Sequence, residues 1–67
     1  GKMIQKSILE NIAAQASKSL DPSPSVALHG CTYEDRYYLC GLCKKYGLNI
    51  SWEENGNITT FHLEKRR

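Results

Sequence analysis

The sequence lacks any long run of apolar residues. No segment approaches the roughly 18 consecutive apolar residues that cross a bilayer, and the first residues alternate polar and apolar types instead of forming a signal-peptide block. Cysteine is sparse and odd in number, at three residues. A chain this small from an oxidising compartment would more often carry a paired set. We therefore expect reduced thiols, an intracellular location and no membrane association.

The chain also has little length and little excess charge. Its 67 residues suffice for one domain with a small core, and leave no room for a second domain or a deep catalytic cleft. A formal net charge of +2 permits a polyanionic partner without demanding one. Gly1-Lys2-Met3 leads directly into a helical pattern, and Lys65-Arg66-Arg67 ends in charge. We expect residues 1–67 to be one domain cut from a larger protein, with flexible ends at 1–2 and 65–67.

Apolar residues recur at every fourth position from Ile4 to Leu20, which predicts an amphipathic helix. The expected buried stripe is Ile4, Ile8, Ile12, Ala16 and Leu20. The prolines of Asp21-Pro22-Ser23-Pro24 should end this helix. The segment from Ser25 to His29 is extended in character and predicts a short strand, with Val26 and Leu28 on one side.

A second helix is predicted after Gly30. Thr32-Tyr33-Glu34-Asp35 resembles a capping box with Asp in place of the usual Glu or Gln, and the two acidic residues suit the positive end of a helix. Gly47 can adopt the left-handed conformation of a C-terminal cap, so the helix should end at Tyr46.

Asn55-Gly56 predicts a type I′ turn that joins two alternating segments into a hairpin. Pairing outward from this loop places Trp52 opposite Thr59, Ile50 opposite Phe61 and Leu48 opposite Leu63. The other face is mostly polar: Asn49, Ser51, Glu53, Ile58, Thr60 and His62. The fold class is therefore α+β, ordered helix-strand-helix-strand-strand, with a small three-stranded sheet covered on one face by two helices. The expected core is Leu48, Ile50, Trp52, Phe61 and Leu63 with Ile8, Ile12, Leu39 and Leu42.

The second helix has two contrasting sides. A projection at about 100° per residue turns Leu39, Leu42, Cys43 and Tyr46 toward the sheet. The opposite side, which we call the aromatic flank, consists of Tyr33, Arg36, Tyr37, Cys40 and Lys44. Cations neutralise phosphates, and aromatic or guanidinium planes stack on unpaired bases, so this combination favours single-stranded nucleic acid over a duplex.

The segment Asp35-Arg36-Tyr37-Tyr38-Leu39-Cys40-Gly41-Leu42-Cys43-Lys44-Lys45-Tyr46-Gly47-Leu48 resembles the core of the R-3-H domain family, named for an Arg and a His separated by three residues. Arg36 matches the family's Arg, and Gly47-Leu48 matches the end of its helix. The resemblance extends from about Val26 to near Lys65. Cys40 stands where the family has His, and Thr59 stands near a position where many members carry an Arg.

The resemblance implies two helices against a three-stranded sheet and binding of single-stranded DNA or RNA. It also implies a monomeric module of a larger nucleic-acid-processing or regulatory protein, beside flanking domains of the same chain, with the nucleus favoured over the cytoplasm. The resemblance points to Arg36, with Cys40 at the family's His position, and the helical projection adds Tyr33, Tyr37 and Lys44 as expected binding residues.

Other constellations give weaker alternatives. His29, Cys31, Cys40 and Cys43 offer four potential zinc ligands, but helical spacing separates the last two onto different faces. The same C-x-x-C lies inside a helix, whereas a thioredoxin-type pair belongs at a helix N-terminus. His29 and His62 have no carboxylate or hydroxyl at triad spacing. Glu53 and Glu54 beside the turn are expected to be solvated. We expect no enzyme, no cofactor and no metal, and the main alternative is a protein-interaction domain that docks through Tyr33 and Tyr37.

Overall fold

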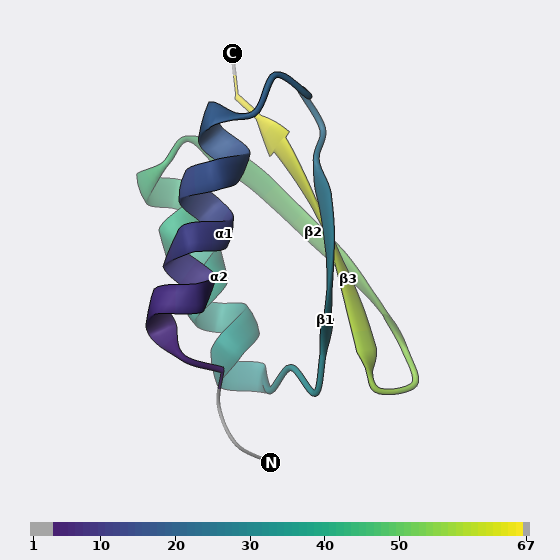
Figure 1. The fold of residues 1–67 in the computed structure, drawn as a ribbon. Helices are drawn as coiled ribbons and strands as arrows, with labels where there is room; N and C mark the ends of the chain where they lie inside the picture. The colour runs from purple at the N-terminus through teal and green to yellow at the C-terminus, as the bar shows by residue number, and fades with distance from the viewer. Residues whose placement is uncertain (1–3, 67) are drawn as a thin grey trace.

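The computed structural model describes residues 4–66. The elements follow the predicted order: α1 (Lys6–Lys18), β1 (Ser25–His29), α2 (Tyr33–Lys45), β2 (Leu48–Asn55) and β3 (Ile58–Lys65). The three strands form one antiparallel sheet with β3 in the centre, in the order β1-β3-β2. Both helices lie on the same side of this sheet (Figure 1). The predicted α+β fold, with one sheet face covered by two helices, is confirmed.

The first helix is shorter than predicted and buries a different stripe. It spans Lys6–Lys18 rather than residues 4–20, and Leu9, Ala13 and Ala16 are its buried residues. Ile8, predicted to be in the core, is 48% exposed, and Leu20 lies beyond the helix in solvent. Four residues turn a helix by more than one full turn, so a strict every-fourth pattern drifts about 40° per step. The spacing of 9, 13 and 16 stays on one face. Of the predicted stripe, Ala16 is buried and Ile4 and Ile12 pack against the core, whereas the prediction was wrong for Ile8 and Leu20.

The second helix begins at the predicted cap, and its last helical residue is Lys45, one before the predicted Tyr46. Thr32 Oγ1 accepts a hydrogen bond from the Asp35 amide at 3.1 Å, and Asp35 Oδ2 accepts one from the Thr32 amide at 2.9 Å, which completes the capping box. Gly47 has φ of +71°, the left-handed conformation expected after the last turn. Asp35 is fully buried, and its Oδ1 also accepts from the Ile4 amide at 3.1 Å. The start of α2 is thereby fastened to the segment that enters α1.

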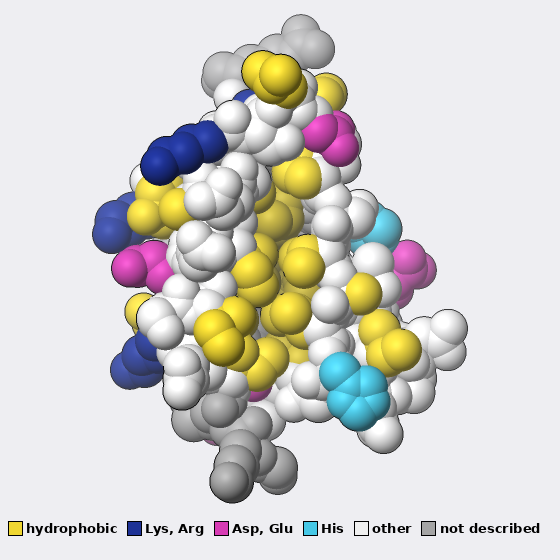
Figure 2. Space-filling view, viewed as in Figure 1, with side chains coloured by type: hydrophobic (Ala, Val, Ile, Leu, Met, Phe, Trp, Pro, Cys, Tyr) yellow, Lys and Arg dark blue, Asp and Glu magenta, His cyan; other side chains and the backbone are white. Residues whose placement is uncertain are grey.

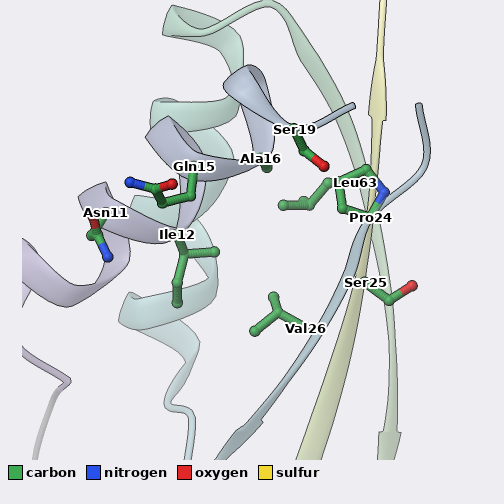
Figure 3. A pocket seen from close by; sticks show the side chains of 9 residues that line it. All are labelled: Asn11, Ile12, Gln15, Ala16, Ser19, Pro24, Ser25, Val26 and Leu63. Carbon is green, nitrogen blue, oxygen red and sulfur yellow. The ribbon is translucent and has the colours of Figure 1, made fainter. Parts of the chain in front are cut away.

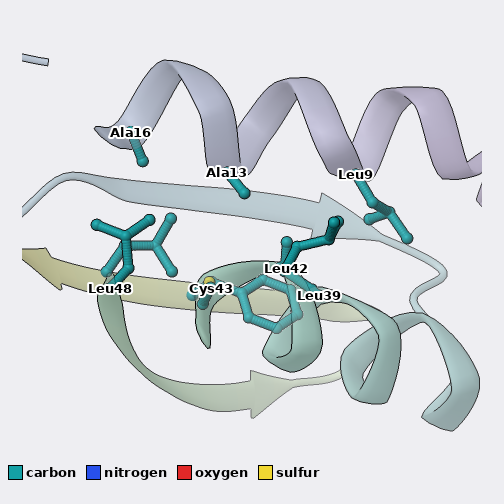
Figure 4. Close-up of a cluster of buried hydrophobic side chains, with 9 residues drawn as sticks. Leu9, Ala13, Ala16, Leu39, Leu42, Cys43 and Leu48 are labelled. Carbon is teal, nitrogen blue, oxygen red and sulfur yellow. The ribbon is translucent and has the colours of Figure 1, made fainter. Parts of the chain in front are cut away.

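The core lies between the helices and the covered face of the sheet. Figure 4 shows Leu9, Ala13 and Ala16 reaching from α1 toward Leu39, Leu42 and Cys43 of α2. Phe61, Leu48 and Leu63 supply the buried side chains of the hairpin, while Ile12, Val26, Leu28 and Ile50 are half-buried against them. Trp52 was expected inside but is 39% exposed, and Thr59 on the same face is buried instead. Leu9, Ala13 and Ala16 of α1 thus face the interior, and Ile8 and Trp52 remain at its margin.

The hairpin register differs from the prediction by two residues. Trp52 pairs with Phe61, Ile50 with Leu63 and Leu48 with Lys65. The loop is Gly56-Asn57, because Asn55 pairs with Ile58. A type I′ turn needs positive φ at both loop residues, but among residues 4–66 only glycines have positive φ, and Gly56 has +64°. Positive φ at the first loop residue alone is the pattern of a type II′ turn with Gly there. A shift of two residues preserves side-chain parity, so the predicted faces are correct although the partners are not.

The C-terminal residues continue the sheet. Lys65 is the last residue of β3, and the Arg66 amide donates to the Gly47 carbonyl at 3.0 Å. Flexible ends were expected at residues 1–2 and 65–67; of these, Lys65 and Arg66 are joined to the sheet, and residues 1–2 and 67 lie outside the described part of the chain. Across residues 4–66, neither helix is long and apolar enough to span a membrane.

Candidate nucleic-acid interface

The most exposed feature of the aromatic flank is a pair of tyrosine rings. Tyr33 and Tyr37 lie one turn apart on α2, with ring centroids 6.1 Å apart and planes only 21° from parallel. They are 67% and 73% exposed. The other two tyrosines of this region are half-buried, and cations already lie over their rings: Lys6 over Tyr38 and Lys45 over Tyr46. The Tyr33–Tyr37 stack is therefore an open aromatic surface.

Arg36 lies beside this stack but is already engaged. Its side chain is only 17% exposed, its Nη1 donates to the Cys31 carbonyl at 3.3 Å, and the same nitrogen lies 3.6 Å from Glu54 Oε1. Two contacts thus hold the guanidinium between the N-terminal end of α2 and the turn end of β2. The sequence prediction of a solvated Glu54 is only partly correct, because this exposed carboxylate faces a cation from another element.

Lys44 and Cys40 complete the flank toward the C-terminal end of α2. Lys44 is exposed, so its ammonium is accessible to an anionic ligand. Cys40 is half-buried, and this burial raises the pKa of its thiol, with Lys44 acting in the opposite direction. Cys40 therefore presents a neutral, weakly hydrogen-bonding group to this part of the flank.

A third aromatic side chain borders this region. Helix α2 and strand β2 run antiparallel and are joined by Tyr46 and Gly47, and the Arg36–Glu54 contact joins their far ends. Trp52 lies two residues before Glu54 and so shares its side of β2. Its ring packs at 6.0 Å from the Phe61 ring while part of it remains in solvent. Sequence reasoning missed Trp52 as a surface residue, because its place in the apolar alternation assigned it to the core.

The cysteines do not converge. All three are free thiols, with Cys43 buried in the core and Cys31 and Cys40 half-buried, as the helical spacing of the last two predicted. Burial and the neighbouring Cys40 raise the pKa of Cys43 to about 11. Burial, with Asp35 next in effect, also raises the pKa of Cys31. Within residues 4–66, no three His, Cys, Asp or Glu side chains are grouped as metal ligands would be.

The uncovered face of the sheet carries a hydrogen-bond chain that the sequence did not reveal. His62 Nδ1 lies 3.1 Å from Ser25 Oγ, and its Nε2 lies 3.0 Å from Glu53 Oε1. His62 is exposed, as expected of a surface histidine, but its hydroxyl and carboxylate partners are 37 and 9 positions away in the sequence, so no triad spacing indicated them. The three residues belong to three different strands, and only the sheet order aligns them. All three side chains are exposed, and the chain of hydrogen bonds links β1 and β2 across β3.

Comparisons with protein-family models, with curated proteins and with solved structures found no match to this chain. The resemblance to the R-3-H domain family thus rests on the residues of the Asp35–Leu48 segment and stays a prediction.

Proposed function

We propose that this domain is a single-stranded nucleic-acid-binding module, acting within a larger protein through the aromatic flank of α2. The observation that carries the proposal is the exposed, nearly parallel Tyr33–Tyr37 stack, with Arg36 and Lys44 on the same flank. Unpaired bases stack on such rings, and each stacked base contributes about 1–3 kcal/mol. The bases of a duplex are already stacked on each other, so a duplex binds less well.

The charges on the flank imply that phosphate contacts contribute little. Lys44 is accessible, but the Arg36 side chain is largely buried, and its Nη1 already contacts the Cys31 carbonyl and the Glu54 carboxylate. We therefore place the two rings at the centre of the proposed site, and the cations at its margin. Each engaged cation adds about 0.7 to the log-log salt slope for a single strand, so binding should be weak and only mildly sensitive to salt. Such a module contributes to affinity together with other domains.

Fluorescence anisotropy tests the proposal directly. Labelled oligo-dT and oligo-U single strands of about 12 nucleotides, and a matched duplex, are titrated at about 25 mM and 150 mM salt. We expect both single strands to bind and the duplex to bind less. The double variant Tyr33→Ala/Tyr37→Ala should bind at least about tenfold more weakly, since two stacking surfaces are lost. Tyr33→Phe/Tyr37→Phe keeps both rings and should bind like the wild type.

A control on the far side of the molecule separates stacking from general hydrophobic attraction. Ile58 is a large exposed apolar residue on the hairpin, away from the flank, and Ile58→Ala should leave binding unchanged. If the folded wild-type chain shows no anisotropy change with any single strand at low salt, the nucleic-acid proposal is wrong.

The pairing of Arg36 with Glu54 favours one second candidate, a protein-docking surface. The Glu54 carboxylate neutralises the positive charge of Arg36, while the Tyr33 and Tyr37 rings beside it remain exposed. Tyrosine is enriched in protein interfaces because it offers a large, rigid contact area. The two candidate functions predict different ligands. A protein-docking domain would not bind single strands, but its binding to a protein partner would be abolished in the Tyr33→Ala/Tyr37→Ala variant.

A further inference from the structure

Strand β1 is an edge of the sheet, and its outer side has no strand partner among residues 4–66. Pro24 accepts from the Leu63 amide at 2.9 Å and Gly30 donates to the Asn57 carbonyl at 2.8 Å, so these two residues point inward to β3. Inward and outward residues alternate along an antiparallel strand. The backbone amides and carbonyls of Ser25, Ala27 and His29 therefore point outward, away from β3.

The two edges of the sheet differ in how they are protected. Edge strands usually carry charged residues, proline or a bulge that discourages pairing with another chain. The edge strand β2 carries Glu53 and Glu54. Strand β1 contains no charged residue and no proline, and its pairing with β3 continues without a bulge from Ser25 to His29. The β1 edge is thus open to a further strand.

Apolar surface lies next to this edge. A cavity of about 320 Å³ opens between α1 and β1, and its apolar walls come from Ile12, Ala16, Pro24, Val26 and Leu63. Figure 3 shows Ile12 and Val26 extending into it from the two sides. In the space-filling view, a band of apolar side chains lines the furrow between the helix and the strand (Figure 2). A strand added to β1 would meet apolar surface on its helix side and water on its other side.

We propose that the partner of this edge is β1 of a second copy of the chain, paired antiparallel about a two-fold axis at Ala27. This register places Ala27 opposite itself and Ser25 opposite His29, so that the outward-pointing backbone groups of both strands meet as hydrogen-bonded pairs. Val26 then lies opposite Leu28 on the helix side, beside the apolar furrow. The site requires an uncharged extended segment with alternating apolar residues, and β1 is itself such a segment.

The distribution of charged side chains favours pairing through the β1 edge over pairing through the β2 edge. Two β1 strands bring no formally charged side chains together, whereas two β2 strands would bring Glu53 and Glu54 of both copies to one seam. The pairing joins two three-stranded sheets into one of six strands. It replaces the monomer expected from the sequence, and it does not depend on nucleic-acid binding.

Sedimentation equilibrium of the whole chain tests the dimer. The short seam gives a weak association, and the mass should rise from 7.6 kDa toward twice that value as the concentration approaches about 1 mM. Ala27 is exposed and opposite itself in the proposed register, so Ala27→Lys and Ala27→Glu should each stay monomeric. Mixed one to one, they should form a dimer again, because opposite charges then meet at the axis.

Matched measurements keep the test decisive. Ser51→Lys places the same charge on the same face of β2, away from the seam, and should dimerise like the wild type. Circular dichroism should show every variant folded. A wild type that remains monomeric at about 1 mM, or a mixture of the two Ala27 variants that remains monomeric, overturns the proposal. A monomeric chain that instead takes up a strand-forming peptide also overturns it, and identifies a peptide as the occupant.

Discussion

Arg36 and Glu54 form an ion pair across the boundary between helix and hairpin, with 3.6 Å between Nη1 and Oε1. Eighteen positions separate them in the sequence. The same guanidinium nitrogen donates to the Cys31 carbonyl, so Arg36 is held from two sides. In the proposed function, Glu54 occupies the place that a ligand phosphate would take.

Replacing Glu54 should therefore tighten binding of a single strand. Glu54→Gln removes the competing charge and frees Arg36 for phosphate, and we expect up to about fivefold higher affinity, the equivalent of about 1 kcal/mol for an exposed ion pair. The salt slope should steepen by about 0.7 as one more cation engages. Both quantities come from anisotropy titrations at several salt concentrations.

Two controls isolate this effect from net charge. Glu53→Gln makes the same charge change one residue away, where the carboxylate contacts His62 rather than Arg36, and should leave affinity nearly unchanged. In an Arg36→Ala background, Glu54→Gln should lose its effect, since the cation that it releases is gone. Equal gains from Glu53→Gln and Glu54→Gln would show that only the overall charge matters.

Cys40→His should make binding depend on pH. The substitution introduces a group that titrates at about pH 6.5, so affinity for a single strand should rise as pH falls through that value. Burial keeps the pKa of the native Cys40 thiol above its usual range, and the wild type should show no such change. Titrations at pH values on both sides of this midpoint compare the two proteins. A wild type with the same pH dependence would contradict the assignment.

Neighbouring residues of α1 should differ sharply in their effect on stability. Leu9 is buried and Ile8 is half-exposed, although both are large apolar residues. Leu9→Ala should lower the free energy of unfolding by about 2–5 kcal/mol, because it leaves a cavity in the core. Ile8→Ala should lower it by well under half of that. Urea denaturation measures both, and a larger loss from Ile8→Ala than from Leu9→Ala would mean that the helix is rotated by one position.

Asp35→Asn should destabilise the domain without changing its shape. The buried carboxylate accepts hydrogen bonds from the Thr32 and Ile4 amides, and an asparagine NH₂ would face one of these donors. We expect a loss of about 1–3 kcal/mol in the free energy of unfolding. Glu34→Gln, the same change at the exposed neighbour, should have little effect. Faster exchange of the Ile4 amide in Asp35→Asn would identify the lost contact.

The Cys43 thiol should be the slowest of the three to react. Its pKa is raised from 9.0 to about 11, so the reactive thiolate is scarce at pH 8, and its side chain is fully buried. Iodoacetamide followed by mass spectrometry should modify Cys31 and Cys40 first. An unfolded chain forms this thiolate near pH 9, so the contribution of Cys43 to stability should be complete below pH 9 and decline toward pH 11. In Cys43→Ala this part of the decline should disappear.

Most of the fold could be predicted because it depends on local signals. The α2 cap needs only residues three apart, its end needs only Gly47, and the faces of the hairpin follow from alternation. The predictions of the α1 stripe and of the hairpin register were not correct, because local signals allowed more than one solution there. Several apolar patterns fit α1, and two loop positions fit Asn55-Gly56-Asn57, so the sequence left near-equal alternatives that packing had to separate.

The candidate site was predictable as a list of residues and unpredictable as an arrangement. Helical spacing alone placed Tyr33, Arg36, Tyr37, Cys40 and Lys44 on one flank. It did not show that the two rings stack in the open, or that Arg36 is held by Glu54. The Ser25–His62–Glu53 chain likewise joins residues from three strands, and no spacing along the chain predicts it.

The sequence by itself determined the element order, the caps of α2, the two faces of the hairpin and the composition of the aromatic flank, since each depends on residues within a few positions of one another. Only the tertiary structure decided that Leu9 rather than Ile8 is buried, that Arg36 meets Glu54, and that β1 is an open edge beside an apolar furrow. These features involve segments that are far apart in the sequence, so they depend on how the two helices pack against the three strands around a small core.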